Sequence, residues 1–121
     1  MKDENEEIEV YKGSGNPFAD AGFSNPEEAL AKAELARQIY KVIKSKRITQ
    51  TQAAKIMGIA QPKVSEIVRG KLSGFTIDRL MRFLRLLGRD VEIHIKKHEQ
   101  KNRNPWLAVV DETRPKGKRA F

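Results

Sequence analysis

The chain has 121 residues, of which 39% are hydrophobic and 33% are charged, so it can form one small domain with tails rather than a sizeable enzyme body. It contains no cysteine, which excludes disulfides and thiolate metal sites. No apolar run approaches the roughly 20 residues that span a bilayer, and the acidic N-terminus lacks the apolar core of a signal peptide. We therefore expect a cytoplasmic protein without a membrane partner.

The net charge of +8 is unevenly distributed along the chain. Residues 1–28 carry −6, residues 29–90 carry +10, and residues 91–121 carry +4. A compact segment this basic favours a polyanionic partner such as nucleic acid. The alternative is a helical surface that is merely rich in lysine and arginine.

Residues 1–25 are predicted to form a flexible acidic arm, because glycine, asparagine and proline recur there. Only Ile8–Tyr11 alternates enough for a short strand. Phe18 and Phe23 lie in this arm, where large rings more often pack back onto a core than anchor a partner.

Three helices follow in chain order. Asn25 as N-cap and Pro26 at the first helical position predict a helix from 26 to about 46. Thr49 and Gln52 resemble a capping box for a helix over about 50–57, which Gly58 can end in the left-handed conformation. A third helix is predicted over about 61–69.

A fourth helix is predicted from Thr76, its N-cap, to about Leu87, and the hydrophobic period then changes from 3.6 to 2. Val91, Ile93 and Ile95 alternate with polar residues, which predicts a short β-strand. A single strand is not stable alone, so it must pair with residues 8–11, with its own copy in a dimer, or with another protein. Residues 97–121 have the composition of a basic tail.

The segment from Gln50 to Gly70 carries the main functional signal. Two short amphipathic helices joined at Gly58 predict a helix-turn-helix, whose second helix enters the major groove of DNA. Ala53 and Ala54 supply the small side chains that a close helix crossing needs. The alternative is an ordinary helical hairpin.

The sequence shows no sign of an enzyme. It contains no nucleophile–base set, no phosphate-binding glycine loop and no carboxylate dyad, so we expect no catalytic residues and no cofactor. His94 and His98 are four residues apart, but no third ligand is evident, so no metal site is expected.

This segment resembles the helix-turn-helix of the XRE family, the phage-repressor and Cro-type regulators. The matching positions are Gln50, Ala54, Gly58, Ile59, Val64, Ser65, Ile67 and Gly70. The flanking stretches SGNPFADAGF, PEEALAKAELA and LLGRDVEI are similar to a subgroup often encoded beside RelE/HigB-like toxins. Members resembling HigA antitoxins bind the toxin and repress their own operon.

The resemblance implies roles for individual residues. The residues expected to contact bases are Gln61, Lys63, Ser65, Glu66 and Arg69. The residues expected to contact phosphates are Gln50, Lys46, Arg47, Lys71 and Ser73. Pro62 departs from the pattern, because phage repressors often have a second base-reading side chain there. Glu66 either accepts from cytosine or pairs within its helix with Lys63 or Arg69.

One such module contacts few base pairs, so we expect a homodimer on a palindromic double-stranded operator. The residues expected at the dimer interface are Phe83, Leu86, Val91, Ile93 and Ile95. The alternative for Phe83 and Leu86 is that both only broaden the core stripe of their helix.

The predicted fold is therefore mainly α: a four-to-five-helix, phage-repressor-like helix-turn-helix domain over residues 26–96, followed by a short β-strand. The arms are residues 1–25 and 97–121. The predicted function is a sequence-specific, dimeric autorepressor, associated with the nucleoid, that is also the antitoxin of a RelE/HigB-like toxin. One alternative is a stand-alone XRE-type repressor with no toxin partner. Another is a non-specific nucleoid or RNA-binding protein that uses the same basic surface.

Overall fold

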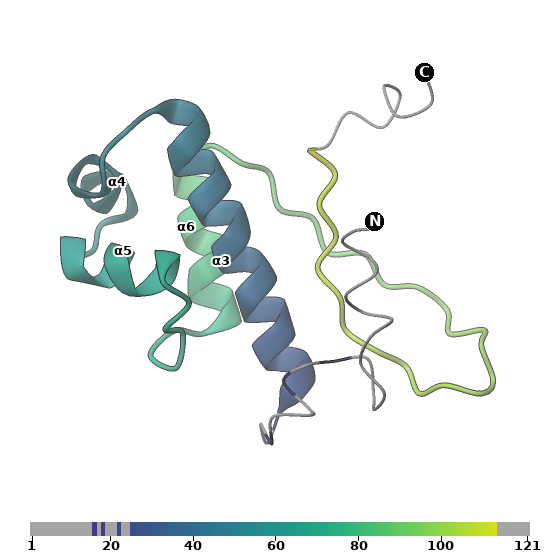
Figure 1. The fold of residues 1–121 in the computed structure, drawn as a ribbon. Coiled ribbons are helices and arrows are strands. Elements are labelled where there is room, and N and C mark those ends of the chain that lie inside the picture. Colours follow the sequence, from purple (N-terminus) through teal and green to yellow (C-terminus); the bar gives the residue numbers. More distant parts are fainter. Residues whose placement is uncertain (1–15, 17, 19–21, 23–24, 114–121) are drawn as a thin grey trace, which may run out of the picture.

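Four helices form the body of the protein, which we describe from a computed structural model (Figure 1). The structure describes Asn16, Phe18, Gly22 and residues 25–113. The helices are α3 (Pro26–Lys46), α4 (Gln50–Met57), α5 (Gln61–Val68) and α6 (Ile77–Leu86). Their order and bounds confirm the predicted helical layout to within a residue at each end. None of them combines the length and apolar character needed to cross a membrane.

The long helix α3 begins and ends as its sequence predicts. The Asn25 side chain accepts a hydrogen bond from the backbone N–H of Glu28 at 3.2 Å, and Pro26 occupies the first turn. At the other end Arg47 is left-handed, with φ of 56°, and its N–H bonds the carbonyl of Lys44 at 3.1 Å. Arg47 is the one described residue other than glycine with a positive φ, and it turns the chain towards α4.

The core lies where α3 packs against α6 and α5, and where α4 packs against α5 and α6. Its most buried side chains come from all four helices and the loop before α6: Ile39, Val42, Ala53, Val64, Ile67, Phe75 and Leu80. Phe75 and Phe83 meet edge to face, with ring centroids 6.2 Å apart. Because the two short helices share this core with two longer ones, α5 is held rigidly at the surface of the molecule.

Phe83 is a correction to the predicted dimer interface. Only 3% of it is exposed, and it packs in the core of its own chain. The apolar face of α6 that packs in the core is therefore wide enough to include Phe83. Leu86 differs, because 43% of it is exposed.

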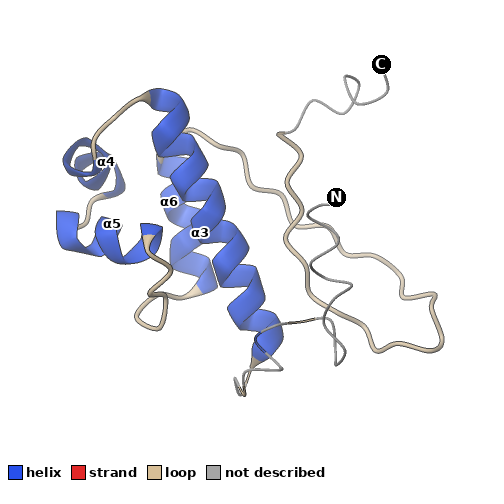
Figure 2. Cartoon of the chain, viewed as in Figure 1, coloured by secondary structure: helices blue, strands red, loops and turns tan. Residues whose placement is uncertain are grey.

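The strand predicted over Val91–Ile95 is not confirmed. Figure 2 shows helices and loops only in the described part of the chain, and residues 89–100 have no regular secondary structure. The physical reason is that a β-strand needs a neighbouring strand to accept and donate its backbone hydrogen bonds. Among the described residues, no other segment pairs with residues 91–95 in this way. The candidate partner Ile8–Tyr11 lies outside the described residues.

The segment after α6 runs out from the body and returns along α3 (Figure 1). Val91 and Val109 both pack against the core, one on the way out and one on the way back. The Asp111 side chain is only 6% exposed and accepts a hydrogen bond from Lys41 Nζ at 2.7 Å. Part of the predicted tail is therefore fixed to α3.

Asp111 is held in its ionised form. Burial alone would raise its pKa, but hydrogen bonds from Lys41, Thr113 and Gln38 outweigh that effect and hold the pKa of Asp111 well below its ordinary value. The guanidinium of Arg37 lies 3.7 Å from the same carboxylate. This ionised contact joins residues 70 positions apart in the sequence.

Candidate nucleic-acid interface

The helix-turn-helix is formed by α4, the turn at Gly58 and α5 (Figure 1). A capping box starts α4: the Thr49 hydroxyl accepts from the Gln52 N–H at 3.0 Å, and the Gln52 side chain accepts from the Thr49 N–H at 2.8 Å. Gly58 ends it with φ of 74°, and its N–H donates to the Ala54 carbonyl at 2.8 Å. The predicted capping box and left-handed turn are both confirmed.

The small residues Ala53 and Ala54 permit the close crossing of α4 and α5. Ala53 is fully buried and Ala54 is 5% exposed, and both belong to the shared core. On α5 the buried side chains are Val64 and Ile67, so the opposite face of this helix is turned outward.

The first turns of the two helices are joined by a side-chain contact. Gln61 Nε2 donates to Gln50 Oε1 at 2.8 Å, and these residues open α5 and α4 respectively. From the sequence, Gln61 is expected to contact bases and Gln50 is expected to contact a phosphate. The structure places the two amides side by side on the exposed surface, so one orients the other.

Lys63 and Glu66 also meet on the outward face of α5. Lys63 Nζ lies 3.5 Å from Glu66 Oε1, with the lysine side chain 51% exposed. Of the two roles left open for Glu66, the intrahelical pair is the one seen in the free protein. The ammonium of Lys63 also lies 5.8 Å from the centroid of the Phe75 ring, so it is positioned beside the loop that precedes α6.

Ser65 and Arg69 complete the set predicted to contact bases. Ser65 is half-buried, whereas Arg69 is exposed at the C-cap of α5, where its Nε donates to the Ser65 carbonyl at 3.3 Å. Arg69 therefore extends from the end of the helix, farther along the surface than Gln61 and Lys63.

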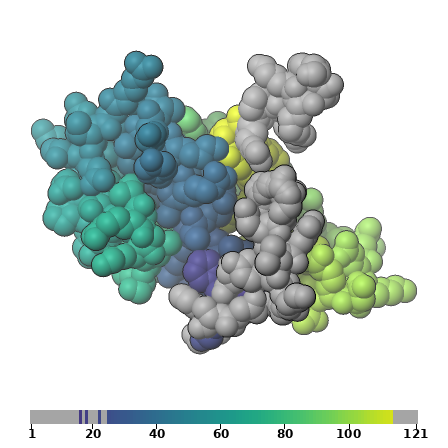
Figure 3. Space-filling view, viewed as in Figure 1, coloured from purple at the N-terminus to yellow at the C-terminus, as the bar shows by residue number. Residues whose placement is uncertain are grey.

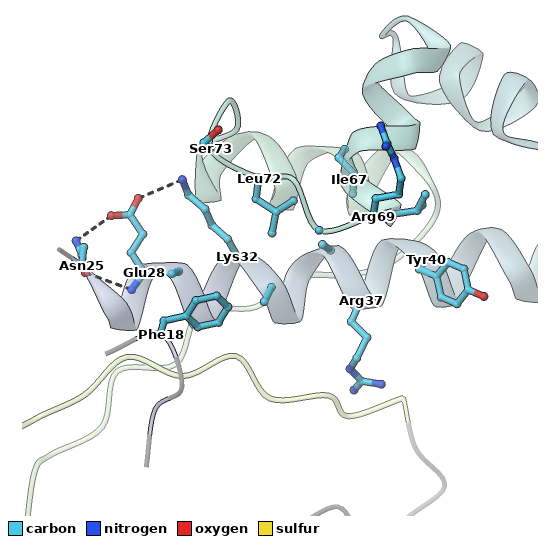
Figure 4. A pocket seen from close by; sticks show the side chains of 15 residues that line it. Phe18, Asn25, Glu28, Lys32, Arg37, Tyr40, Ile67, Arg69, Leu72 and Ser73 are labelled. Carbon is cyan, nitrogen blue, oxygen red and sulfur yellow. Dashed lines mark hydrogen bonds and ion pairs between the residues drawn. The ribbon is translucent and has the colours of Figure 1, made fainter. Parts of the chain in front are cut away.

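A groove of about 700 Å³ separates the end of α5 from the first half of α3. Arg69 and Ser73 line it from one side, and Lys32 and Arg37 line it from α3 (Figure 4). Phe18 lies at the α3 side of this groove and is half-buried, which agrees with the packing interpretation of that ring. Phe23 lies outside the described residues.

The three remaining residues predicted to contact phosphates lie at three different places. Lys71 is exposed in the loop after α5, and Arg47 is exposed in the turn before α4. The Lys46 ammonium lies against Gly88, just after the C-terminal end of α6, where a cation is favoured by the helix dipole. The structure therefore does not bring Lys46 to the outward face of α5.

Neither histidine is part of a metal centre in the described structure. Nε2 of His94 lies 2.9 Å from Glu92 Oε1, and Nε2 of His98 lies 2.7 Å from the Arg103 carbonyl oxygen. Among the described residues, no three side chains of the ligating types come together to hold an ion.

Comparison with known proteins identifies this architecture. A family model described as a helix-turn-helix domain matches residues 17–96, more than half of the chain. The chain belongs to this helix-turn-helix family. A solved structure provisionally named an XRE-family transcriptional regulator is 41% identical, with a TM-score of 0.67. The match covers 70% of this chain and 96% of that one.

The protein is therefore an XRE-type, DNA-binding transcriptional regulator, and proteins of this kind are typically not enzymes. No protein with curated annotation matches the chain. The XRE-type assignment comes from the helices and their turn. The Gln50–Gln61 contact and the anchored segment after residue 96 were not visible in the sequence, because both depend on tertiary positions rather than on local pattern.

Proposed function

We propose that this XRE-type regulator is a dimeric, sequence-specific repressor that reads its operator through the outward face of α5. The observation that carries this proposal is the joined pair Gln50 and Gln61. The hydrogen bond between these amides lies at the surface, at the first turn of α5, and Lys63, two residues after Gln61, is also exposed. Glutamine suits the adenine edge and lysine suits guanine O6 and N7, so this surface fits the major groove.

Replacing Lys63 by alanine tests the readout. If Lys63 reads a base, the variant loses about 1–3 kcal/mol at the selected operator and discriminates less well at one position. A contact to phosphate alone would instead weaken all duplexes alike and lower the salt slope by about one unit. Arg82→Ala is the matched control, because Arg82 is also an exposed cation but belongs to α6 rather than to α5. Equal losses on random and selected DNA contradict sequence-specific recognition by Lys63.

The dimer is proposed to form through the segment after α6. Ile93 is 74% exposed and Ile95 is 91% exposed, an unusual state for large apolar side chains with alternating polar neighbours. In a dimer, this segment could pair antiparallel with its own copy, with Ile93 at the centre, so that Glu92 lies opposite the copy's His94. This pairing would supply the backbone hydrogen bonds that the segment lacks in a single chain. Leu86 and Val91 would continue the apolar surface.

Sedimentation of Ile93→Lys tests the interface. We expect the variant to be monomeric at concentrations where the unaltered protein is dimeric, with operator affinity reduced because two half-sites are no longer linked. Val110→Lys is the matched control, since Val110 is 72% exposed but lies outside the proposed pairing. A variant that remains dimeric would remove Ile93 from the interface.

We further propose that the repressor is the antitoxin of a RelE/HigB-like toxin. The support is the similarity of the flanking segments to that subgroup, together with the net charge of −6 on residues 1–28. Toxins that hold RNA are basic, so the acidic arm is an electrostatically suitable partner surface. The basic C-terminal tail with Trp106 is the rival surface. Most of this arm lies outside the described residues.

Co-expression with the product of the neighbouring reading frame is the direct test. We expect the two proteins to co-purify and the regulator to restore growth. Repression without dependence on an adjacent gene product would favour the alternative, a stand-alone XRE-type repressor. In both cases we expect the protein to be found with the nucleoid in the cytoplasm.

A further inference from the structure

We propose that the protein has a second nucleic-acid site, separate from α5, that binds a single strand. It is the loop of residues 96–106, called here the basic loop. Its cations would hold phosphates, and Trp106 would stack on a base. This site goes beyond the proposed operator binding and does not depend on it.

The net positive charge of the basic loop is the first observation that supports nucleic-acid binding. Lys96, Lys97, Lys101 and Arg103 stand against one acid, Glu99. All residues from 92 to 108 are exposed. Within the described part of the chain, no carboxylate forms an ion pair with any of the three lysines. Unpaired, solvated cations grouped in one loop attract a polyanion without first breaking internal contacts.

Trp106 gives the basic loop an organised centre. The guanidinium of Arg103 lies 4.1 Å from the centroid of the indole ring, and the His98 ring meets it edge-on at 6.0 Å. His98 Nε2 also lies 2.7 Å from the Arg103 carbonyl oxygen, so the three side chains hold one turn together. Trp106 nevertheless remains 49% exposed. The Arg103 guanidinium covers one face of the indole, so an unpaired base would stack on the opposite face of a ring that is already held in place.

Both ends of the basic loop are fixed to the body of the protein. Val91 precedes it and Val109 follows it, and both pack against the core. Asp111 then holds the chain to Lys41 of α3. The loop is thus a fixed projection and not the start of a free tail.

The basic loop lies on the far side of α3 from α4 and α5. Figure 1 shows the helix-turn-helix at one side of α3 and the loop at the other, and Figure 3 shows the same loop projecting from the molecule. A duplex bound against α5 therefore leaves the loop free for another strand. One chain would then hold two nucleic acids at once.

A single strand fits this site better than a duplex does. The bases of a duplex are stacked on one another and offer no open face to Trp106, whereas every base of a single strand has one. RNA and single-stranded DNA share the chemistry required, so the experiment compares both.

The experiment uses the fluorescence of Trp106, which is the only tryptophan in the chain. The full-length protein is titrated with deoxyuridine and uridine oligonucleotides of about 12 nucleotides, which differ only in the sugar and lie within the usual site size for single strands. We expect the tryptophan emission to be quenched on binding, and the quenching to persist when the protein is already saturated with operator duplex. The better of the two oligonucleotides identifies the preferred sugar.

Variants then separate stacking from charge, with labelled oligonucleotides as the readout. Trp106→Ala should weaken binding roughly 5- to 150-fold, and Trp106→Phe should restore most of it. The double variant Lys97→Gln/Lys101→Gln should reduce the slope of the logarithm of the binding constant against the logarithm of the salt concentration. The expected reduction is about 1.4, since each cation on a single strand contributes about 0.7. Lys44→Gln with Arg82→Gln removes the same charge from the helices and should leave both quenching and slope unchanged.

Three results would overturn the proposal: binding of the oligonucleotide without a change in Trp106 emission, displacement of the oligonucleotide by operator duplex, or equally tight binding of polyglutamate. The last would make the loop a site for acidic protein segments. Operator affinity is measured in the same samples. Its loss alone would count against α5 and leave the basic loop in place.

Discussion

Asp111→Asn tests whether the segment after residue 96 contributes to the stability of the helical body. The substitution keeps the shape of the side chain and leaves Oδ1 able to accept from Thr113, whose N–H lies at 2.8 Å. It replaces the oxygen that accepts from Lys41 at 2.7 Å by an amide that can only donate. The variant therefore removes one charge-assisted hydrogen bond and places the side-chain amide N–H of the new residue against the ammonium of Lys41, so that two donors face each other.

The expected loss follows from the exposure of the two partners. A hydrogen bond to a charged group contributes about 1.5–3 kcal/mol when it is well buried. The Asp111 side chain is 6% exposed, but the Lys41 side chain is 38% exposed, so solvent screens part of the attraction. We expect the free energy of unfolding to fall by about 1–2 kcal/mol. For a folded body of this size, each kcal/mol lowers the melting temperature by about 4–8 °C.

Thermal and urea unfolding of Asp111→Asn, Lys41→Gln and the double variant measure the interaction directly. The double-mutant cycle should give a coupling energy of about 1 kcal/mol between the two residues. Glu112→Gln is the matched control, because Glu112 is the next acid along the chain and is exposed. A loss in Asp111→Asn no larger than that in Glu112→Gln would refute the reasoning.

The pH dependence gives a second test with a defined sign. The pKa of Asp111 is lower in the folded protein than in the unfolded chain, so ionisation of Asp111 stabilises the fold above the unfolded value of about 3.9. The stability difference between the unaltered protein and Asp111→Asn should be constant from neutral pH down to about 4, and then shrink as the pH falls further. A difference that stays constant in acid would contradict the assignment.

Three further predictions concern the helices and the DNA-binding face. Thr49→Ala removes the capping box of α4 and should cost about 1 kcal/mol in urea unfolding, whereas Thr51→Ala, inside the same helix, should be neutral or slightly stabilising. Leu80→Ala empties a fully buried position and should cost about 2–5 kcal/mol, enough to leave most of the protein unfolded well below its usual melting temperature. Glu66→Gln frees Lys63 from its ion pair and removes an anion from the face of α5 that is proposed to bind DNA, so fluorescence anisotropy should show tighter binding to duplexes of any sequence. A loss confined to the operator would instead show that Glu66 reads a base.

The helices could be predicted from the sequence because their signals are local. Asn25, Thr49, Gly58 and Thr76 each mark a helix end through a side chain or conformation that acts within a few residues. The outward face of α5 followed from the same helical period.

The parts that could not be predicted depend on contacts between distant residues. The alternation from Val91 to Ile95 indicates a strand, but no other described segment of the chain pairs with it. Phe83 lies near the edge of the apolar stripe of α6, and only its contact with Phe75 shows that the core extends that far. The pairing of Asp111 with Lys41 joins residues 70 positions apart, and no local pattern marks it.

The return of the chain along α3 has a practical consequence for how the protein is divided. The family match ends at residue 96, so a protein shortened there would keep the whole helix-turn-helix. It would also lose Leu107 and Val109, which cover a hollow of about 200 Å³ against Leu30 and Ala31. The fragment would expose apolar surface on α3 and leave Lys41 without its carboxylate partner. It would therefore associate non-specifically with other proteins, and binding studies on it would overstate the number of partners. Chains ending after Thr113 avoid that artefact.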